Sequence, residues 1–219
     1  VASAVVSASL VALTLTSAGL NIAVVREVAA RGAEAFWASL IIATAVGCTA
    51  AVISIPLVSA IGYGGLAPAS ALLAVSSALC TVSLFALVGL ERFRGYFLAV
   101  LAGSVAKLVV GLVLALTGFG ATAAVMGYIA YPLVALCVAA LQLLRVLGFV
   151  AVPRGEAVRG VALLALSNYP YAFSNQLLTM LSVYLFAFLV GEAVATGTLY
   201  IALMVVLAIA AVPGAVLNA

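Results

Sequence analysis

The sequence predicts an all-α integral membrane protein with about seven transmembrane helices. Of its 219 residues, 68% are hydrophobic and only 6% are charged, whereas a soluble domain carries about 25% charged residues. The apolar residues gather in runs of about 20, the length at which a helix crosses a bilayer. These runs are apolar on every face, unlike the alternating strands of a membrane β-barrel. Lipid is therefore the expected solvent for most of the surface.

Seven segments are apolar enough and long enough to be spans. They are predicted at residues 3–25, 35–61, 69–90, 96–116, 121–144, 161–190 and 198–217. Each is expected to be helical, because lipid offers the backbone no hydrogen-bond partners. Pro56, Pro132, Pro170 and Pro213 lie inside these segments, where proline permits a kink.

The loops between these segments alternate between basic and non-basic. Seven of the eight basic residues lie in the first, third and fifth loops: Arg26, Arg31, Arg92, Arg94, Arg145, Arg154 and Arg159. Cytoplasmic loops are enriched in Lys and Arg, so we predict that these three loops are cytoplasmic and that the N-terminus of this chain is external. The first residue is Val rather than Met, so we also expect a fragment of a longer protein.

The composition argues against several classes of function. The formal net charge is only +3, and a nucleic-acid reader needs a dense basic face. The chain has no His and no Asp, and its three cysteines are far apart, so we expect no metal site and no cofactor. We find no nucleophile–base pair, carboxylate pair or phosphate-binding loop, and therefore expect no enzyme.

Lys107 is the one ionisable residue deep within a predicted span. It lies about 16 Å along the helix from Tyr96, near the middle of the membrane. A charge at that depth costs about 3 kcal/mol or more, so the ammonium should face the bundle interior or water. Gly103, Ser104 and Gly111 are small residues on the same face, and they permit close packing or leave space for solvent. We predict a functional cation here; a purely structural hydrogen bond is the alternative.

A polar stripe follows the sixth predicted span. Its members are Asn168, Tyr171, Asn175, Thr179 and Ser182, with Gln176 beside them. Their spacing places them within about 60° of one another on a helix. The stripe is expected to face protein or a cavity, where it either binds a ligand or forms hydrogen bonds between helices.

Three stretches together resemble the polysaccharide biosynthesis and lipid-linked oligosaccharide flippase family, which belongs to the same superfamily as the MATE exporters. The first stretch is residues 19–29, with the run Val25-Arg26-Glu27-Val28-Ala29. The second is Glu91-Arg92-Phe93-Arg94 leading to Lys107, followed by Gly118-Phe119-Gly120 and Gly127. The third runs from Ser167–Pro170 through Gly197 to Tyr200 and Pro213. On this resemblance the chain corresponds to spans two to eight of a protein with twelve or more.

The resemblance implies part of a two-lobed, MATE-like transporter bundle that works by alternating access. Residues 1–144 would form five spans of the first lobe, residues 145–160 a cytoplasmic interlobe linker, and residues 161–219 the start of the second lobe. The implied substrate is a lipid-linked oligosaccharide with an anionic headgroup, flipped from the cytoplasmic to the outer leaflet of the cell membrane. Lys107 would meet the headgroup, and the polar stripe would bind sugar. Many family members have an Asp where this sequence has Ser182, so ion coupling is not expected at that position.

Three other functions compete with the flippase interpretation. A MATE-like exporter of small cationic compounds usually needs carboxylates within its spans, and the spans predicted here have none. A membrane-embedded enzyme acting on lipid-linked sugars would need acidic groups at a membrane face, where Glu27, Glu91 and Glu156 are interleaved with arginines. A structural or assembly subunit is the third alternative. The sequence does not predict an oligomeric state.

Overall fold

The computed structural model describes the backbone of residues 1–148 and 152–217, and the side chains there except at 121, 175–179, 193 and 207–217. All regular elements in these ranges are helices. They are α1 (Ala2–Ser17), α2 (Leu20–Arg31), α3 (Ala33–Ala60), the short 3₁₀ helix η1 (Gly64–Leu66), α4 (Ala67–Gly89), α5 (Phe93–Leu116), α6 (Ala121–Leu147), α7 (Gly155–Val190) and α8 (Ala193–Leu217). The predicted all-α membrane fold is thereby confirmed.

The predicted number of spans is confirmed only in part. Within the described residues, four helices are long and apolar enough to cross a membrane: α3, α4 with η1, α5 and α6. The α1–α2 pair makes a fifth if it counts as one bent span. The described apolar parts of α7 and α8, Met180–Val190 and Val194–Val206, are shorter. The count of seven therefore remains a prediction.

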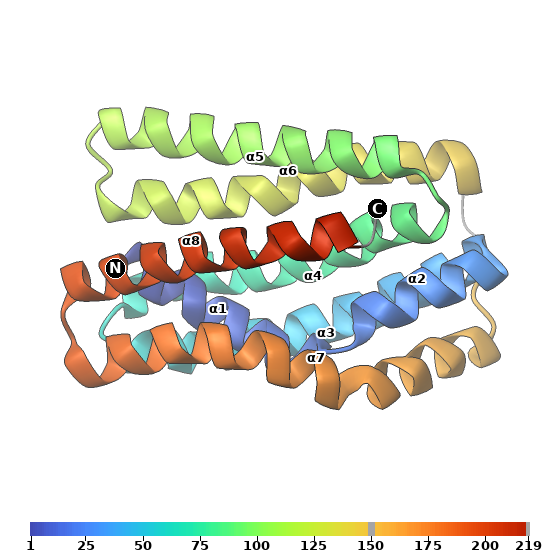
Figure 1. Cartoon of the computed structure of the whole chain (residues 1–219), viewed down its shortest axis with the longest axis horizontal. Coiled ribbons are helices and arrows are strands. Elements are labelled where there is room, and N and C mark those ends of the chain that lie inside the picture. The colour runs from blue at the N-terminus through green and yellow to red at the C-terminus, as the bar shows by residue number, and fades with distance from the viewer. Residues whose placement is uncertain (149–151, 218–219) are drawn as a thin grey trace.

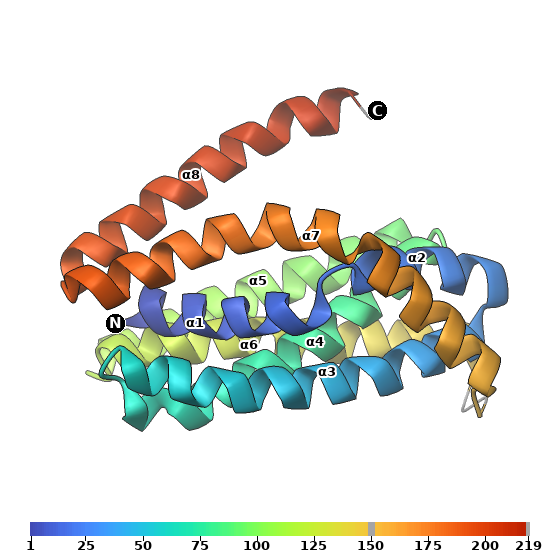
Figure 2. The same ribbon diagram turned by 90° about the horizontal axis from the view of Figure 1, so that it is seen from below.

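The helices form a bundle around α1, which contacts α3, α4, α6, α7 and α8. Helix α1 suits this central place because small residues let neighbouring helices approach closely; Ala4, Ser7, Ala8, Ser9 and Ala12 are all buried. Helices α5 and α6 pair along one edge of the bundle and α7 lies along the opposite edge (Figure 1). Helix α8 leaves the bundle progressively towards the C-terminus (Figure 2).

The first predicted span is not one continuous helix. It is broken between α1 and α2, whose axes differ by 52°. Gly19 adopts a left-handed conformation at the break, with φ of 85°, which glycine tolerates best. The break exposes carbonyl groups at the end of α1 that have no partner within the helix. The Tyr169 hydroxyl of α7 donates to one of them, the Leu15 carbonyl, at 2.9 Å.

Two connections that are predicted to be cytoplasmic are shorter than expected. Helix α2 continues to Arg31, so only Gly32 separates it from α3. Helix α6 continues to Leu147 and α7 begins at Gly155, so the connection between them is residues 148–154 rather than 145–160. The predicted division into lobes at this connection stays a prediction. Basic residues can lie in the last turn of a helix as readily as in a loop, because their long side chains reach the lipid headgroups from there.

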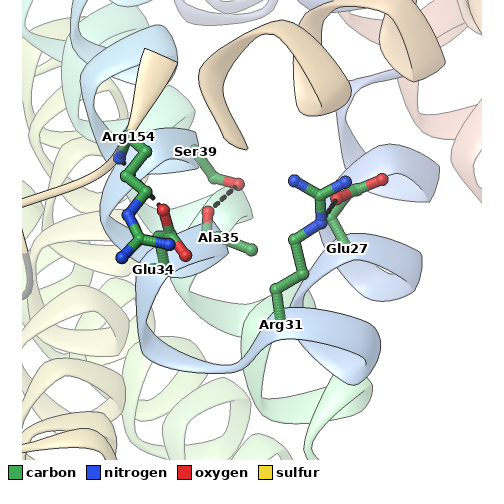
Figure 3. A network of polar contacts seen from close by, with 6 residues as sticks. All are labelled: Glu27, Arg31, Glu34, Ala35, Ser39 and Arg154. Carbon is green, nitrogen blue, oxygen red and sulfur yellow. Dashed lines mark hydrogen bonds and ion pairs between the residues drawn. The ribbon is translucent and has the colours of Figure 1, made fainter. Parts of the chain in front are cut away.

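Polar contacts at this end of the molecule join the first helices to the start of α7 (Figure 3). The Arg31 guanidinium lies 3.1 Å from the Glu27 carboxylate, one turn earlier on α2. The backbone N–H of Arg154 donates to the Glu34 carboxylate of α3 at 3.1 Å. The Glu27 carboxylate also packs close to Gly160 of α7. Glu34 thus ties the start of α7 to α3 by a hydrogen bond, and Glu27 of α2 lies against the first turns of α7.

Candidate binding site

Lys107 is held at the interface between α5 and α6. Its side chain is half-buried, and its ammonium lies 3.5 Å from the centre of the Tyr128 ring on α6. The two helices approach closely because Gly127 of α6 lies against the backbone of α5: a Cβ there would be 2.8 Å from the Lys107 carbonyl oxygen. A cation over an aromatic face gains about 2 kcal/mol when desolvated. The ring therefore offsets part of the cost of burying this charge.

Within the described part of the chain, no carboxylate forms a salt bridge with Lys107. All five acidic residues lie among the described residues, at helix ends or in turns, and the salt bridge found there joins Arg31 to Glu27.

An interior cavity of about 460 Å³ borders Lys107. It lies among α1, α4, α5 and α6 and has an apolar wall that includes Val6, Leu10 and Leu73. Hydroxyl-bearing side chains also line it, from three of the four helices: Ser77, Thr81, Tyr96, Ser104 and Tyr131. These groups both donate and accept hydrogen bonds. The cavity thus combines one cation with several hydroxyl groups, a set that fits an anion carrying polar substituents.

A second cavity, of about 620 Å³, lies along α5 and α6 and is called the α5–α6 groove below. It extends from Ser104 on α5 to Gly120, at the start of α6. Ser104, Lys107 and Tyr128 line both cavities. Lys107 therefore lies at the junction of a hydroxyl-lined cavity and an apolar groove.

Tyr128 also connects the site to α8. Its hydroxyl lies 2.9 Å from that of Tyr200, a residue with 9% of its surface exposed. The sequence analysis did not single out either tyrosine for this role. The available signal was that both lie within apolar segments, where a phenol hydroxyl needs a hydrogen-bond partner. These contacts connect Lys107 on α5, Tyr128 on α6 and Tyr200 on α8.

The described members of the polar stripe on α7 do not line either cavity. Asn168 is half-buried, and its side-chain amide donates to the Leu164 carbonyl at 2.8 Å. Tyr171 is 69% exposed, and Ser182 is exposed as well. The side chains of Asn175, Gln176 and Thr179 lie outside the described residues. Among the described residues, the structure therefore does not bring Lys107 and the stripe together, and a binding role for these residues remains a prediction.

Different residues of α7 face the bundle. Val161, Ala172 and Val183 are buried, and two tyrosines next to this face reach neighbouring helices. Besides the Tyr169 contact with α1, the Tyr184 hydroxyl donates to the Leu57 carbonyl of α3 at 3.2 Å. The described packing face of α7 thus includes Val161, Ala172 and Val183, and the exposed Tyr171 and Ser182 lie outside it.

The apolar helices and the half-buried cation define a membrane protein with a polar site between its helices. Comparison with family models identifies the family: residues 1–203 match the model described as polysaccharide biosynthesis protein, and the chain belongs to that family. No curated protein and no solved structure matches the chain. The family resemblance inferred from short motifs is confirmed, and membership supports a role in handling polysaccharide precursors.

Proposed function

We propose that the protein flips a lipid-linked oligosaccharide, a polysaccharide precursor, from the cytoplasmic to the outer leaflet of the cell membrane. Family membership supports a role with such precursors. A precursor made at the cytoplasmic face and used outside must move a polar headgroup through a hydrocarbon layer, which is costly without a protein path. Two lobes that open the site alternately to each side would provide that path.

The observation that carries this proposal is the position of Lys107. Its ammonium borders a hydroxyl-lined cavity, sits on the Tyr128 ring and forms no salt bridge among the described residues. A phosphate-containing headgroup would supply the missing negative charge, and charge-assisted hydrogen bonds to an oxyanion are among the strongest in proteins. A cationic drug would instead meet a like charge at this position. The site therefore favours an anionic substrate over the cations that MATE-like exporters carry.

The sugar would be bound by hydroxyl and amide groups. Tyr96, Tyr131 and Thr81 offer such groups in the interior cavity. The stripe on α7 (Asn168, Tyr171, Asn175, Gln176, Thr179 and Ser182) would bind sugar in a second conformation, in which its face turns towards the cavity. The hydrogen bond between Tyr128 and Tyr200 links α6 to α8 and is suited to change between the two conformations.

Replacement of Lys107 tests the proposal. The complete protein is reconstituted into vesicles with a fluorescent polyprenyl-diphosphate disaccharide, and the labelled lipid that reaches the opposite leaflet is measured by quenching. Lys107→Ala and Lys107→Gln should abolish flipping at unchanged expression, because neither side chain can pair with a diphosphate. Arg94→Gln, which removes an exposed cation at the end of α5, is the matched control and should flip normally. Normal flipping by both Lys107 variants would refute the proposed role of this residue.

A further inference from the structure

We propose that the α5–α6 groove holds the hydrocarbon tail of the lipid carrier, next to the phosphate bound at Lys107. This inference rests on the proposed function and adds a second part to the same site. The groove takes the tail, Lys107 takes the phosphate, and the interior cavity takes the sugar. The substrate would therefore cross from one cavity to the other at the residues that both cavities share.

The chemistry of the groove changes along its length. Its polar groups, Ser104, Lys107 and the Tyr128 hydroxyl, lie at the end where it meets the interior cavity. Beyond them the described wall is carbon, formed by Leu108, Gly111, Leu112, Ala115, Ala124 and Gly127. Leu108 is 70% exposed and Leu112 is 56% exposed, so the wall is accessible from outside the bundle. A single cation at one end of an apolar groove complements an amphiphile with an anionic head and an apolar chain.

The attraction of the headgroup, rather than hydrophobic burial, must supply the affinity. Lipid tails are as apolar as leucine side chains, so a chain that moves from the bilayer into the groove gains no hydrophobic free energy. The phosphate gains charge-assisted contacts at Lys107. The groove then determines the direction in which the tail leaves the headgroup.

That direction has a consequence for the flipping step. From Lys107 to Ala115 the groove follows α5 for about 12 Å, towards the turn at residues 117–120. The alternation of basic loops predicts that this turn lies outside the cell. A lipid bound here has its head on the cytoplasmic side of its tail, which is the orientation of an inner-leaflet lipid. The groove would therefore hold the incoming lipid after its headgroup reaches mid-membrane and before its tail turns over.

Photolabelling of the complete protein in lipid nanodiscs tests this inference. The probe is geranylgeranyl diphosphate with a diazirine at the end of its chain, and labelled residues are located by mass spectrometry. Label should concentrate on Leu112, Ala115 and Ala124, and excess inorganic pyrophosphate should reduce it. The corresponding alcohol, which lacks the diphosphate, should label these residues about tenfold less, the effect of losing one charge-assisted interaction. Labelling spread evenly over the exposed faces of α3 and α5 would overturn the inference.

A diazirine-bearing phosphatidylglycerol separates a carrier lipid from an ordinary anionic phospholipid. This probe has two hydrocarbon chains, whereas the groove accommodates one. Its label should therefore not concentrate on the residues of the groove. Enrichment equal to that of the diphosphate probe would contradict the inference, because the groove would then be a site for bulk lipid.

Variants that fill the groove provide the second test. Ala115→Phe and Ala124→Phe place a ring at exposed positions of the wall and should remove labelling by the diphosphate probe. Val105→Phe, at a position of α5 that is 52% exposed and lines neither cavity, should label as the parent does. If the filled variants label normally while Lys107→Gln fails to flip, the tail site is wrong and the proposed function stands. If Lys107→Gln both flips and labels normally, the phosphate site at Lys107 is wrong, and with it the placement of the tail beside that site. If the parent protein itself does not flip the labelled lipid, the proposed function fails.

Discussion

At the scale of single residues, the site consists of three side chains connected by a cation–π contact and a hydrogen bond. The Lys107 ammonium lies over the ring of Tyr128, and the Tyr128 hydroxyl meets that of Tyr200. Each polar atom would be costly to bury alone in an apolar bundle. The ring face stabilises the positive charge without neutralising it, so the ammonium keeps its capacity to bind an anion. This arrangement differs from a salt bridge, which would occupy the cation permanently.

The hydroxyl pair can be measured by a double-mutant cycle. Tyr128→Phe and Tyr200→Phe each remove one partner of the same hydrogen bond and should each destabilise the protein by about 0.6 kcal/mol, a typical value within membranes. The double variant should lose no more than either single variant. The free energy of unfolding in detergent micelles is the measurement. Tyr184→Phe, which affects a separate bond to Leu57, should be additive with Tyr128→Phe. Full additivity of Tyr128→Phe and Tyr200→Phe would show that the two hydroxyls do not interact.

At the scale of elements, glycines determine how closely the helices that carry the site can pack. Gly127 lets α6 contact the backbone of α5 at Lys107, whereas Gly111 of α5 has more space: a Cβ there would have Ala123 oxygen as its nearest neighbour, at 3.9 Å. The break at Gly19 works similarly, because it lets the chain between α1 and α2 contact the backbone of α7 near Ala165. Small residues thus place Lys107 beside Tyr128 and α7 against α1.

The two glycines of the α5–α6 pair should respond differently to alanine. Gly127→Ala places a methyl group 2.8 Å from the Lys107 carbonyl oxygen and 3.2 Å from the Gly111 Cα. The helices would have to separate, at a cost of about 1–3 kcal/mol. Gly111→Ala meets only ordinary contacts and should be neutral or stabilising by about 0.5–1 kcal/mol, because alanine loses less backbone entropy in a helix. Thermal unfolding compares the two; a similar loss in both would contradict this account of the packing.

Gly19 and Gly32 form a second matched pair. Both have positive φ, 85° and 61°, so alanine should cost each about 1–3 kcal/mol of backbone strain. At Gly32 a Cβ would have nothing within 4 Å, whereas at Gly19 it would overlap the Ala165 carbonyl oxygen and lie 3.0 Å from the Asn168 carbonyl carbon. Gly19→Ala should therefore destabilise the protein more than Gly32→Ala does, by about 1–3 kcal/mol. Equal stability of the two variants would exclude a packing role for Gly19.

At the scale of the whole molecule, charge and hydropathy determine how the bundle lies in the membrane. Glu27, Arg31, Glu34 and Arg154 lie close together (Figure 3), at the end of the bundle where α2 ends and α7 begins (Figure 1). The turn at residues 117–120 carries no charge. Basic residues favour the cytoplasmic side. The end drawn in Figure 3 is therefore the predicted cytoplasmic end, and the turn between α5 and α6 is predicted to be external.

Cysteine accessibility tests this orientation. In a variant without Cys48, Cys80 and Cys137, a single cysteine is introduced at Thr117 or at Glu156, both exposed positions. A membrane-impermeant maleimide should label Thr117→Cys in intact cells, because that turn is predicted to be outside. It should label Glu156→Cys only after the cells are permeabilised. The reverse pattern would invert the topology and, with it, the inner-leaflet orientation proposed for the lipid in the groove.

The length and composition of the apolar runs predict lipid as the solvent, helices as the structure and a mid-membrane position for Lys107. In a bilayer the backbone must satisfy its own hydrogen bonds, so the length and composition of each apolar run were enough to predict a helix. The position of a charge along that run was enough to place it near mid-membrane. The motifs around Glu91 to Arg94 and Gly118 to Gly120 were enough to indicate the family, which the family match confirmed.

The face of each helix that meets a given neighbour depends on contacts between distant segments, which no local pattern specifies. The segments are apolar all round, so hydropathy gives no preferred face, and small residues and polar contacts between distant positions make the choice instead. Tyr128 and Tyr200 are 72 residues apart in the chain, and no local spacing pairs them. The break at Gly19 and the position of Asn168, Tyr171 and Ser182 outside both cavities likewise depend on how α7 packs against α1 and α2. Lipid specifies that a segment is a helix, whereas the fit of side chains between helices specifies where each residue points.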